Sequence, residues 1–104
     1  MGIVHVLAVL TTKPGMRERA LEAFQANVPN VLVEDGCIEY QAVVDLDGAG
    51  PMQTPMGSDS FVVIEKWESM EALAAHAAAP HMKAYGKATA DMMADRKIHI
   101  LTEA

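Results

Sequence analysis

The chain has 104 residues, 51% of them hydrophobic, and a formal net charge of −6. A chain of this length is expected to form one domain, residues 1–104, with enough apolar side chains for a core of its own. The acidic balance, without a basic cluster, excludes nucleic-acid phosphates as a partner, and no apolar run approaches the roughly 20 residues of a membrane span. Cys37 is the only cysteine, so no internal disulfide is expected and a reducing cytoplasm fits.

The first part of the chain predicts a strand, a helix and a second strand. Residues 3–12 are rich in Val and Leu and end at the turn signal Lys13-Pro14-Gly15. Residues 16–34 then carry apolar side chains at helical spacing, and Pro29 is expected to kink or divide this helix. Residues 37–45 alternate well enough for the second strand.

The second part begins with residues 46–59, which hold three Gly and two Pro without periodicity. We expect a loop there, longer than a usual hairpin connection, that is either a functional flap or disordered. The remaining residues predict a strand, two helices and a last strand: 60–67, 69–78, 80–95 and 96–102. Ser69 suits the cap of the first of these helices. Pro80 interrupts the helical stretch and suits the first turn of the next helix.

The order βαββαβ predicts an α+β fold of the ferredoxin-like kind, a four-stranded antiparallel sheet with the first and third strands in the middle. Those two strands are apolar on both faces, as Val62 and Val63 of the third strand illustrate. Two helices cover only one face of such a sheet. Leaving the other face in water costs roughly 1.5–3 kcal/mol per large apolar side chain, so we expect a homodimer packed sheet to sheet.

A recognisable pattern spans the third strand and the helices after it: Glu65-Lys66-Trp67-Glu68-Ser69, Ala72-Leu73, His76, Pro80-His81 and Tyr85. The turn Lys13-Pro14-Gly15 and the passage Glu34-Asp35-Gly36-Cys37 join it. Together they resemble the antibiotic biosynthesis monooxygenase (ABM) family over nearly the whole chain, and its quinol monooxygenase branch most closely. The resemblance implies a dimeric α+β barrel with a ligand cleft between each sheet and its helices.

The resemblance also implies a range of activities. The family includes cofactor-free oxygenases of quinols and polycyclic anthrones, haem-degrading enzymes, and an isomerase of a phosphorylated signalling sugar. The haem-degrading members pair an Asn of the first strand with the Trp and a helix His, whereas Ala8 stands nearest that position here. This difference argues against haem and favours the cofactor-free oxygenases.

His76 and His81 are the first candidates for metal ligands. On one continuous helix, residues five apart point roughly 140° away from each other, and the HExxH spacing is absent. Pro80 also separates the two histidines. We therefore expect no metal site at this pair.

A catalytic role suits the same residues better. Oxidation of a quinol-like or polyphenolic molecule by dioxygen, without a cofactor, needs a base for a phenolic proton, apolar walls and donors for the oxyanion. We assign the base to His76, with His81 and Glu65 in support. Glu65 shares a strand face with the Trp and is expected to orient a histidine. The substrate-binding candidates are the aromatic residues Trp67, Phe61 and Tyr85, with Met82 as deformable filler.

Each of these residues has a purely structural alternative. His76 can satisfy free carbonyls at a helix end, and His81 can organise the junction after the proline. Trp67 and Met82 can be ordinary core. Glu65 can form an ion pair at the rim with a lysine, either Lys66 or Lys97.

Two further functions stay open from the sequence. One is an isomerase or other proton-transfer enzyme for a small carbonyl compound, using the same His and Glu pair without oxygen. A phosphorylated substrate would need cations at the cleft, and the sequence clusters none. The other is a non-enzymatic dimer that binds an apolar metabolite, because a fold does not by itself imply an activity.

Overall fold

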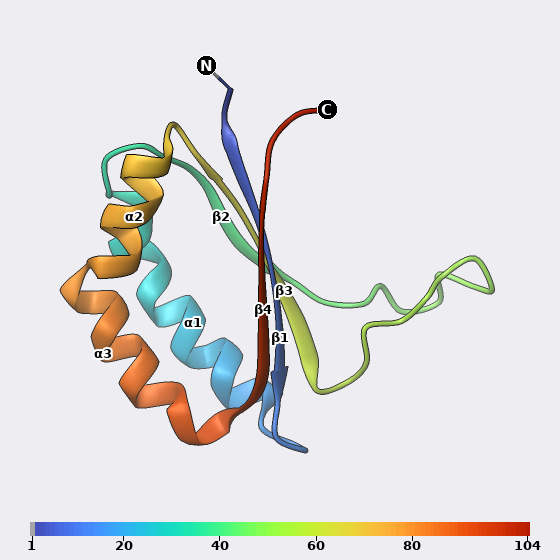
Figure 1. Cartoon of the computed structure of the whole chain (residues 1–104). Helices are drawn as coiled ribbons and strands as arrows, with labels where there is room; N and C mark the ends of the chain where they lie inside the picture. The colour runs from blue at the N-terminus through green and yellow to red at the C-terminus, as the bar shows by residue number, and fades with distance from the viewer. Residues whose placement is uncertain (1) are drawn as a thin grey trace.

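The computed structural model describes residues 2–104, which follow the predicted order βαββαβ (Figure 1). The strands are β1 (Val4–Thr12), β2 (Cys37–Val43), β3 (Ser60–Trp67) and β4 (Met93–Leu101). The helices are α1 (Arg17–Leu32), α2 (Met70–Ala78) and α3 (Pro80–Thr89), and the short 3-10 helix η1 (Ala90–Met92) links α3 to β4.

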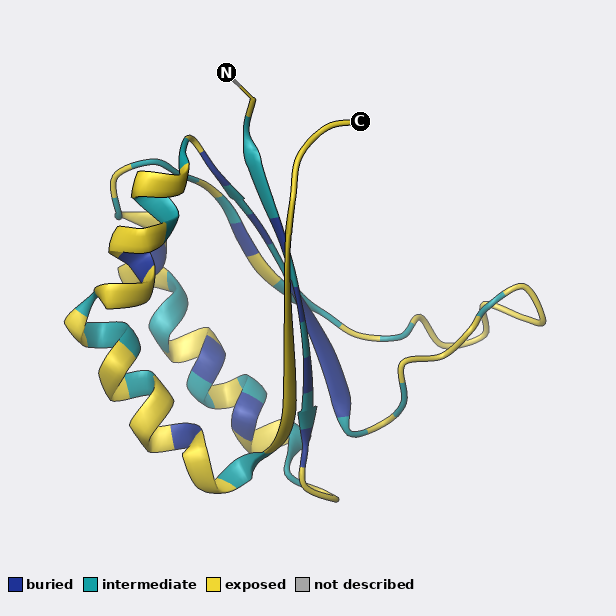
Figure 2. Ribbon diagram, viewed as in Figure 1, coloured by how far each residue is buried: buried dark blue, intermediate teal, exposed yellow. Residues whose placement is uncertain are grey.

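The four strands form one antiparallel sheet in the order β2-β3-β1-β4. The ferredoxin-like fold is therefore confirmed, with β1 and β3 in the middle as predicted. All the helices lie on one side of the sheet (Figure 1). The buried core lies between this side and α1, and it includes Leu10 of β1, Phe61 and Trp67 of β3, and Phe24 and Val31 of α1 (Figure 2).

The other side of the sheet, which we call the open face, has no helix over it (Figure 1). Cross-strand pairs on this face place apolar side chains in its centre: Leu7 opposite Ile64, and Val9 opposite Val62. Polar residues of the outer strands surround them, among them Lys97 and His99 on β4 and Glu39 and Gln41 on β2. The open face is thus apolar at its centre and polar at its margins.

Two predicted boundaries differ from the structure. Helix α1 continues through Pro29 to Leu32 without being divided. Because the proline lies in the last turn and is exposed, water can satisfy the carbonyl that its missing N–H leaves free.

The second difference is the end of α3, expected near residue 95 but found at Thr89. The Thr89 hydroxyl donates to the Tyr85 carbonyl over 2.9 Å, and the Lys13 N–H donates to the Met92 carbonyl over 2.8 Å. The adjacent residues Met92 and Met93 suit either a helix or a strand. Pairing with β1 therefore determines that the chain is extended from Met93 onward.

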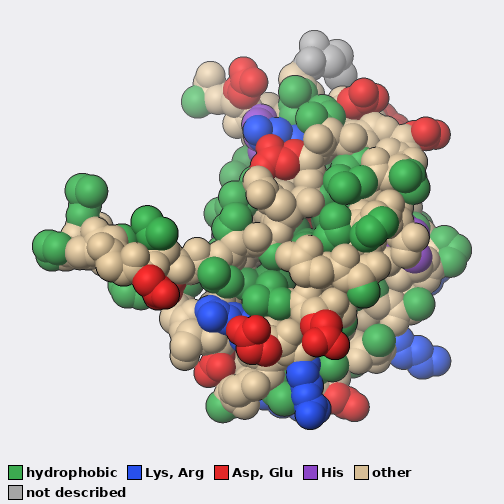
Figure 3. Space-filling model, turned by 180° about the vertical axis from the view of Figure 1, so that it is seen from behind, with side chains coloured by type: hydrophobic (Ala, Val, Ile, Leu, Met, Phe, Trp, Pro, Cys, Tyr) green, Lys and Arg blue, Asp and Glu red, His purple; other side chains and the backbone are tan. Residues whose placement is uncertain are grey.

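The loop between β2 and β3 projects from the body on the side away from the helices (Figure 1). Its base is fixed by the carboxylate of Asp45, which accepts hydrogen bonds from the N–H groups of Met56 (2.8 Å) and Gly57 (3.0 Å). Further out, Leu46 is 73% and Met52 93% exposed. Apolar side chains on the projecting loop are visible in Figure 3.

Candidate active site

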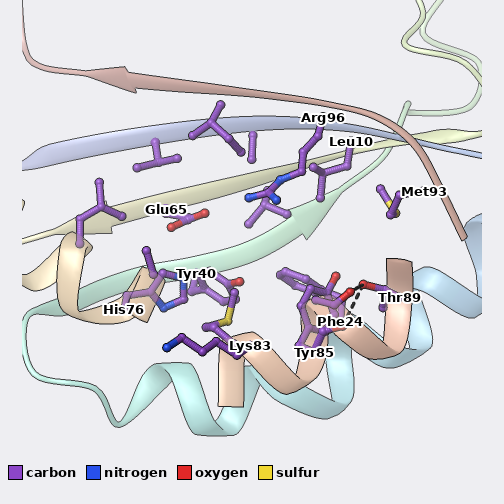
Figure 4. A pocket seen from close by; sticks show the side chains of 18 of the residues that line it. Leu10, Phe24, Tyr40, Glu65, His76, Lys83, Tyr85, Thr89, Met93 and Arg96 are labelled. Atoms are coloured by element: carbon purple, nitrogen blue, oxygen red, sulfur yellow. Dashed lines mark hydrogen bonds between the residues drawn. The ribbon is translucent and has the colours of Figure 1, made fainter. Parts of the chain in front are cut away.

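A cavity of about 460 Å³ lies between the sheet and helices α2 and α3 (Figure 4). This volume is within the range of about 300–1,000 Å³ usual for small-molecule pockets. Most of its lining is apolar or aromatic, and the polar side chains in it include Glu65 of β3, His76 of α2 and Arg96 of β4. The edge strand β4, which contributes Met93, Arg96 and Ile98 to the lining, is largely exposed (Figure 2).

His76 is held in one orientation by a carboxylate. Its Nδ1 lies 2.8 Å from Oε2 of Glu34, and the imidazole is only 5% exposed. Because a carboxylate only accepts hydrogen bonds, Nδ1 carries the hydrogen, and in the neutral form of the ring Nε2 holds the lone pair. Glu34 lies outside the cavity lining, whereas His76 is part of it. The arrangement therefore presents a histidine with a basic nitrogen to the cavity.

His81 approaches the same carboxylate from α3. Its Nε2 lies 3.1 Å from Oε2 of Glu34, although outside the direction needed for a hydrogen bond. The two imidazole centroids are 6.5 Å apart. The separation of roughly 140° holds for one continuous helix, whereas here the extended residue Ala79 before Pro80 turns the second helix, so that both histidines approach Glu34. His81 is not part of the cavity lining.

The turn between α1 and β2 brings Glu34 to the histidines. Gly36 in this turn has a φ of 82°, and its carbonyl accepts a hydrogen bond from the Glu68 N–H over 2.9 Å. A Cβ at Gly36 would lie 2.6 Å from the Cβ of Ala72 on α2. The turn thus packs directly against α2, the helix that carries His76.

The sequence predicted Glu65 as the carboxylate that orients a histidine. In the structure Glu65 instead accepts a hydrogen bond from Nε1 of Trp67 over 2.9 Å, and Glu34 occupies the position beside His76. The alternative of a rim ion pair is also wrong: Lys66 pairs with Glu39, and Lys97 pairs with Asp95. Glu65 is 7% exposed and lines the cavity.

Burial raises the pKa of Glu65 above its ordinary range, and the hydrogen bond from Trp67 and the nearby His76 only partly offset this. Between the ordinary and the raised value, the folded chain keeps a proton that the unfolded chain has released. The contribution of Glu65 to the free energy of unfolding therefore decreases as pH rises through this window.

The aromatic walls of the cavity come only in part from the residues expected. Trp67 and Phe61, which the sequence predicted as substrate-binding residues, are fully buried and lie outside the lining of this cavity. Trp67 instead packs against the ring of His76, with centroids 4.6 Å apart. Tyr85 and Met82 do line the cavity, as predicted.

Phe24 and Tyr40 complete the wall, and their rings stack with centroids 5.1 Å apart. Burial raises the pKa of the Tyr40 hydroxyl and of the Tyr85 hydroxyl. Both tyrosines therefore remain protonated at neutral pH and can donate a hydrogen bond to an oxyanion in the cavity.

Two cationic residues are also part of the cavity lining, Lys83 of α3 and Arg96 of β4 (Figure 4). The sequence suggested that no cations gather at the cleft, and this was wrong. The two residues are 13 positions apart in the chain, and only the return of β4 alongside β1 brings them to one cavity.

No group of three or more His, Cys, Asp and Glu side chains within residues 2–104 is arranged to hold a metal ion. In the same residues, no helix is long and apolar enough to cross a bilayer.

The family model for antibiotic biosynthesis monooxygenases matches residues 3–88. The chain belongs to the ABM family. The Escherichia coli (strain K12) protein named "Probable quinol monooxygenase YgiN" is 43% identical over 101 residues, which cover 95% of this chain and 96% of YgiN. The resemblance read from the residues 65–85 and the two turns is therefore confirmed.

Solved structures agree with this ABM fold. PA3566 from Pseudomonas aeruginosa superimposes with a TM-score of 0.84 at 23% identity, covering 100% of this chain and 96% of its own. Rv0793 from Mycobacterium tuberculosis gives a TM-score of 0.79 at 22% identity, covering 98% of this chain and 95% of its own. At these identities the likeness concerns the fold alone.

Sequence reasoning did not single out Glu34, nor the lining residues Phe24, Tyr40, Lys83 and Arg96. Glu34 had one signal, since it opens the passage Glu34-Asp35-Gly36-Cys37 that belongs to the family resemblance. A carboxylate directly after a helix end gives no sign by itself of the histidine it will contact.

Proposed function

We propose that the protein is a cofactor-independent monooxygenase that oxidises a quinol-like or polyphenolic molecule with dioxygen. The observation that carries this proposal is the pair of His76 and Glu34 at 2.8 Å, with His76 in the lining of an apolar cavity. The relationship to YgiN, which is named for quinol oxidation, supports the same substrate class.

The proposed reaction begins when Nε2 of His76 removes a proton from a ring hydroxyl. Glu34 stabilises the imidazolium that forms, because its carboxylate accepts the Nδ1 hydrogen. The phenolate then transfers an electron to dioxygen, and the two radicals combine at a ring carbon to give a hydroperoxide. Loss of water leaves one oxygen atom on the product, so that a hydroquinone and dioxygen become a hydroxyquinone and water.

The cavity has two tasks in this scheme. Its aromatic walls, Phe24, Tyr40 and Tyr85, hold a flat ring and keep the reduced oxygen species away from bulk water. The protonated tyrosine hydroxyls donate to the oxyanion as charge develops there. Electrons for oxygen reduction come from the substrate itself, so the scheme requires no further redox group.

The protein is also proposed to act as a homodimer through the open face. Leu7, Val9, Val62 and Ile64 form an apolar centre there that no helix covers. The projecting loop lies on the same side and carries the exposed side chains of Leu46 and Met52. A second copy packed sheet to sheet would bury this surface.

The experiment that tests the activity is dioxygen uptake with a panel of reduced quinones and anthrones, from which the autoxidation rate is subtracted. Uptake above autoxidation, with one water formed per dioxygen consumed, would support the monooxygenase. A product that contains no oxygen atom from labelled dioxygen would contradict it.

A second candidate is favoured by one observation, the presence of Lys83 and Arg96 in the cavity lining. Cations of this kind suit an isomerase that moves a proton within a small anionic carbonyl compound. Such an enzyme exchanges substrate hydrogens with solvent in the absence of oxygen. Anaerobic deuterium exchange into dicarbonyl compounds therefore separates the two candidates.

A further inference from the structure

Arg96 brings a positive charge into the cavity that no other side chain neutralises. It stands on β4 opposite Leu10 of β1, and both residues line the cavity. Among residues 2–104 its side chain forms no ion pair and no hydrogen bond. All five N–H donors of the guanidinium are therefore available to a ligand.

The neighbours of Arg96 on β4 do not share this property. Asp95 and Lys97 lie on the opposite face of the strand, opposite Thr11 and Val9 of β1, and they pair with each other at 2.6 Å. Their charges compensate locally in solvent. Arg96 is thus the one residue of this charged run whose charge faces the cavity.

Arg96 is exposed to solvent on β4, and no carboxylate of the described cavity lining pairs with it. Leu10 and Met93 near it are apolar, and the single carboxylate among the described lining residues is Glu65. Glu65 accepts a hydrogen bond from Trp67 and forms no ion pair with Arg96.

The charge of Arg96 does reach into the cavity. Burial raises the pKa of the Tyr85 hydroxyl, and the guanidinium of Arg96 opposes that rise. In Figure 4 the guanidinium extends from β4 toward the middle of the cavity, whereas the ammonium of Lys83 points away from it. Arg96 is therefore better placed than Lys83 to meet a bound molecule.

We propose that Arg96 binds an anionic substituent of the substrate, so that the cavity selects an aromatic quinol carrying a carboxylate. The inference rests on the proposed function and names the substrate class of the same site. The ring hydroxyl lies at His76 and the carboxylate at Arg96. A guanidinium fork matches a carboxylate with two parallel hydrogen bonds.

The test is a binding measurement with one matched pair of ligands, 2,5-dihydroxybenzoate and its methyl ester, by calorimetry in the absence of oxygen. The two differ in charge and share the ring and both hydroxyls. The intact protein is expected to bind the acid about tenfold more tightly than the ester, as one partly exposed charge-assisted contact would give. In Arg96→Gln the acid and the ester are expected to bind with about the same affinity.

Two control variants keep the result specific. Lys97→Gln removes a charge from the same strand on the opposite face, and Lys83→Gln removes the other cation of the cavity lining. Both are expected to keep the preference for the acid. The proposal would be overturned if the acid failed to bind or if acid and ester bound with equal affinity. It would also be overturned if the preference for the acid survived Arg96→Gln, or if that preference were lost in Lys83→Gln alone.

The same experiment separates this inference from the proposed function. Binding is measured without turnover, so a protein that prefers the acid but consumes no dioxygen would refute the oxygenase and keep the role of Arg96. Oxidation of neutral quinols by a protein without any preference for the acid would refute the role of Arg96 alone.

Discussion

The turn that carries Glu34 allows a prediction whose size follows from two features of its geometry. Replacement of Gly36 by alanine forces a side chain into a left-handed conformation, φ 82°, which costs about 1–2 kcal/mol. It also sets the new Cβ 2.6 Å from the Cβ of Ala72. Overpacking of this kind costs about 1–3 kcal/mol, so Gly36→Ala is expected to lower the free energy of unfolding by about 2–5 kcal/mol in total.

A matched control separates the two contributions. Gly15 has a similar φ of 76°, but a Cβ there has no atom within 4 Å. Gly15→Ala is therefore expected to cost only the backbone part, about 1–2 kcal/mol. In the double variant, Ala72→Gly opens the space that the new Cβ needs, at a helix-propensity cost of about 1 kcal/mol.

Urea unfolding at one fixed protein concentration measures these differences, because the stability of a dimer depends on concentration. Gly36→Ala should be the more damaging of the two single variants, and Ala72→Gly should recover part of its loss. Equal losses for Gly36→Ala and Gly15→Ala, or a fully additive double variant, would refute the close packing of this turn on α2.

Three further predictions concern charge and assembly. Glu34→Gln keeps an acceptor for the Nδ1 hydrogen of His76 but loses the charge that stabilises the imidazolium. The value of kcat is therefore expected to fall about tenfold or more while KM stays unchanged. A change in KM alone would contradict a positioning role for Glu34. Glu65→Gln should weaken the loss of thermal stability that accompanies a rise in pH above the ordinary range of a carboxyl group, measured as Tm, because the residue with the raised pKa is gone; an unaltered pH profile would contradict this. Ile64→Lys on the open face should halve the mass measured by light scattering to that of one 11.2 kDa chain. The control variant Val33→Lys, at an 82% exposed site, should leave the mass unchanged. A dimeric Ile64→Lys protein would refute the proposed interface.

The sequence predicted the fold closely because its signals are local and agree with one another. Strand β3 has the predicted bounds, Ser60–Trp67, and Ser69 caps α2 by accepting the Ala72 N–H. The prediction of the strand rests on alternation and that of the helix start on capping, and each signal lies within a few residues. The end of α3 depends instead on pairing between β4 and β1, which the local pattern around Met93 does not contain.

The site was less predictable, for a physical reason. Alternation correctly placed Trp67 and Phe61 on the inner face of the sheet, but it does not say how deep a side chain lies on that face. Phe61 packs against Phe24 of α1 and Trp67 packs against His76 of α2, so that Phe24 and Tyr40 are left to form the cavity wall. The contact of His76 with Glu34 joins residues 42 positions apart, and only the packed turn at Gly36 creates it.

Dioxygen uptake by the metal-stripped protein, with the panel of reduced quinones and anthrones, tests the central claim most directly. We predict uptake above autoxidation for at least one compound, a loss of about 10²–10⁴-fold in His76→Ala, and an unchanged rate in His99→Ala, whose side chain lies on the opposite face of the sheet, across from Leu7. Uptake that His76→Ala leaves intact, or no uptake above autoxidation with any compound, would contradict the claim that His76 is the base of an oxygenase.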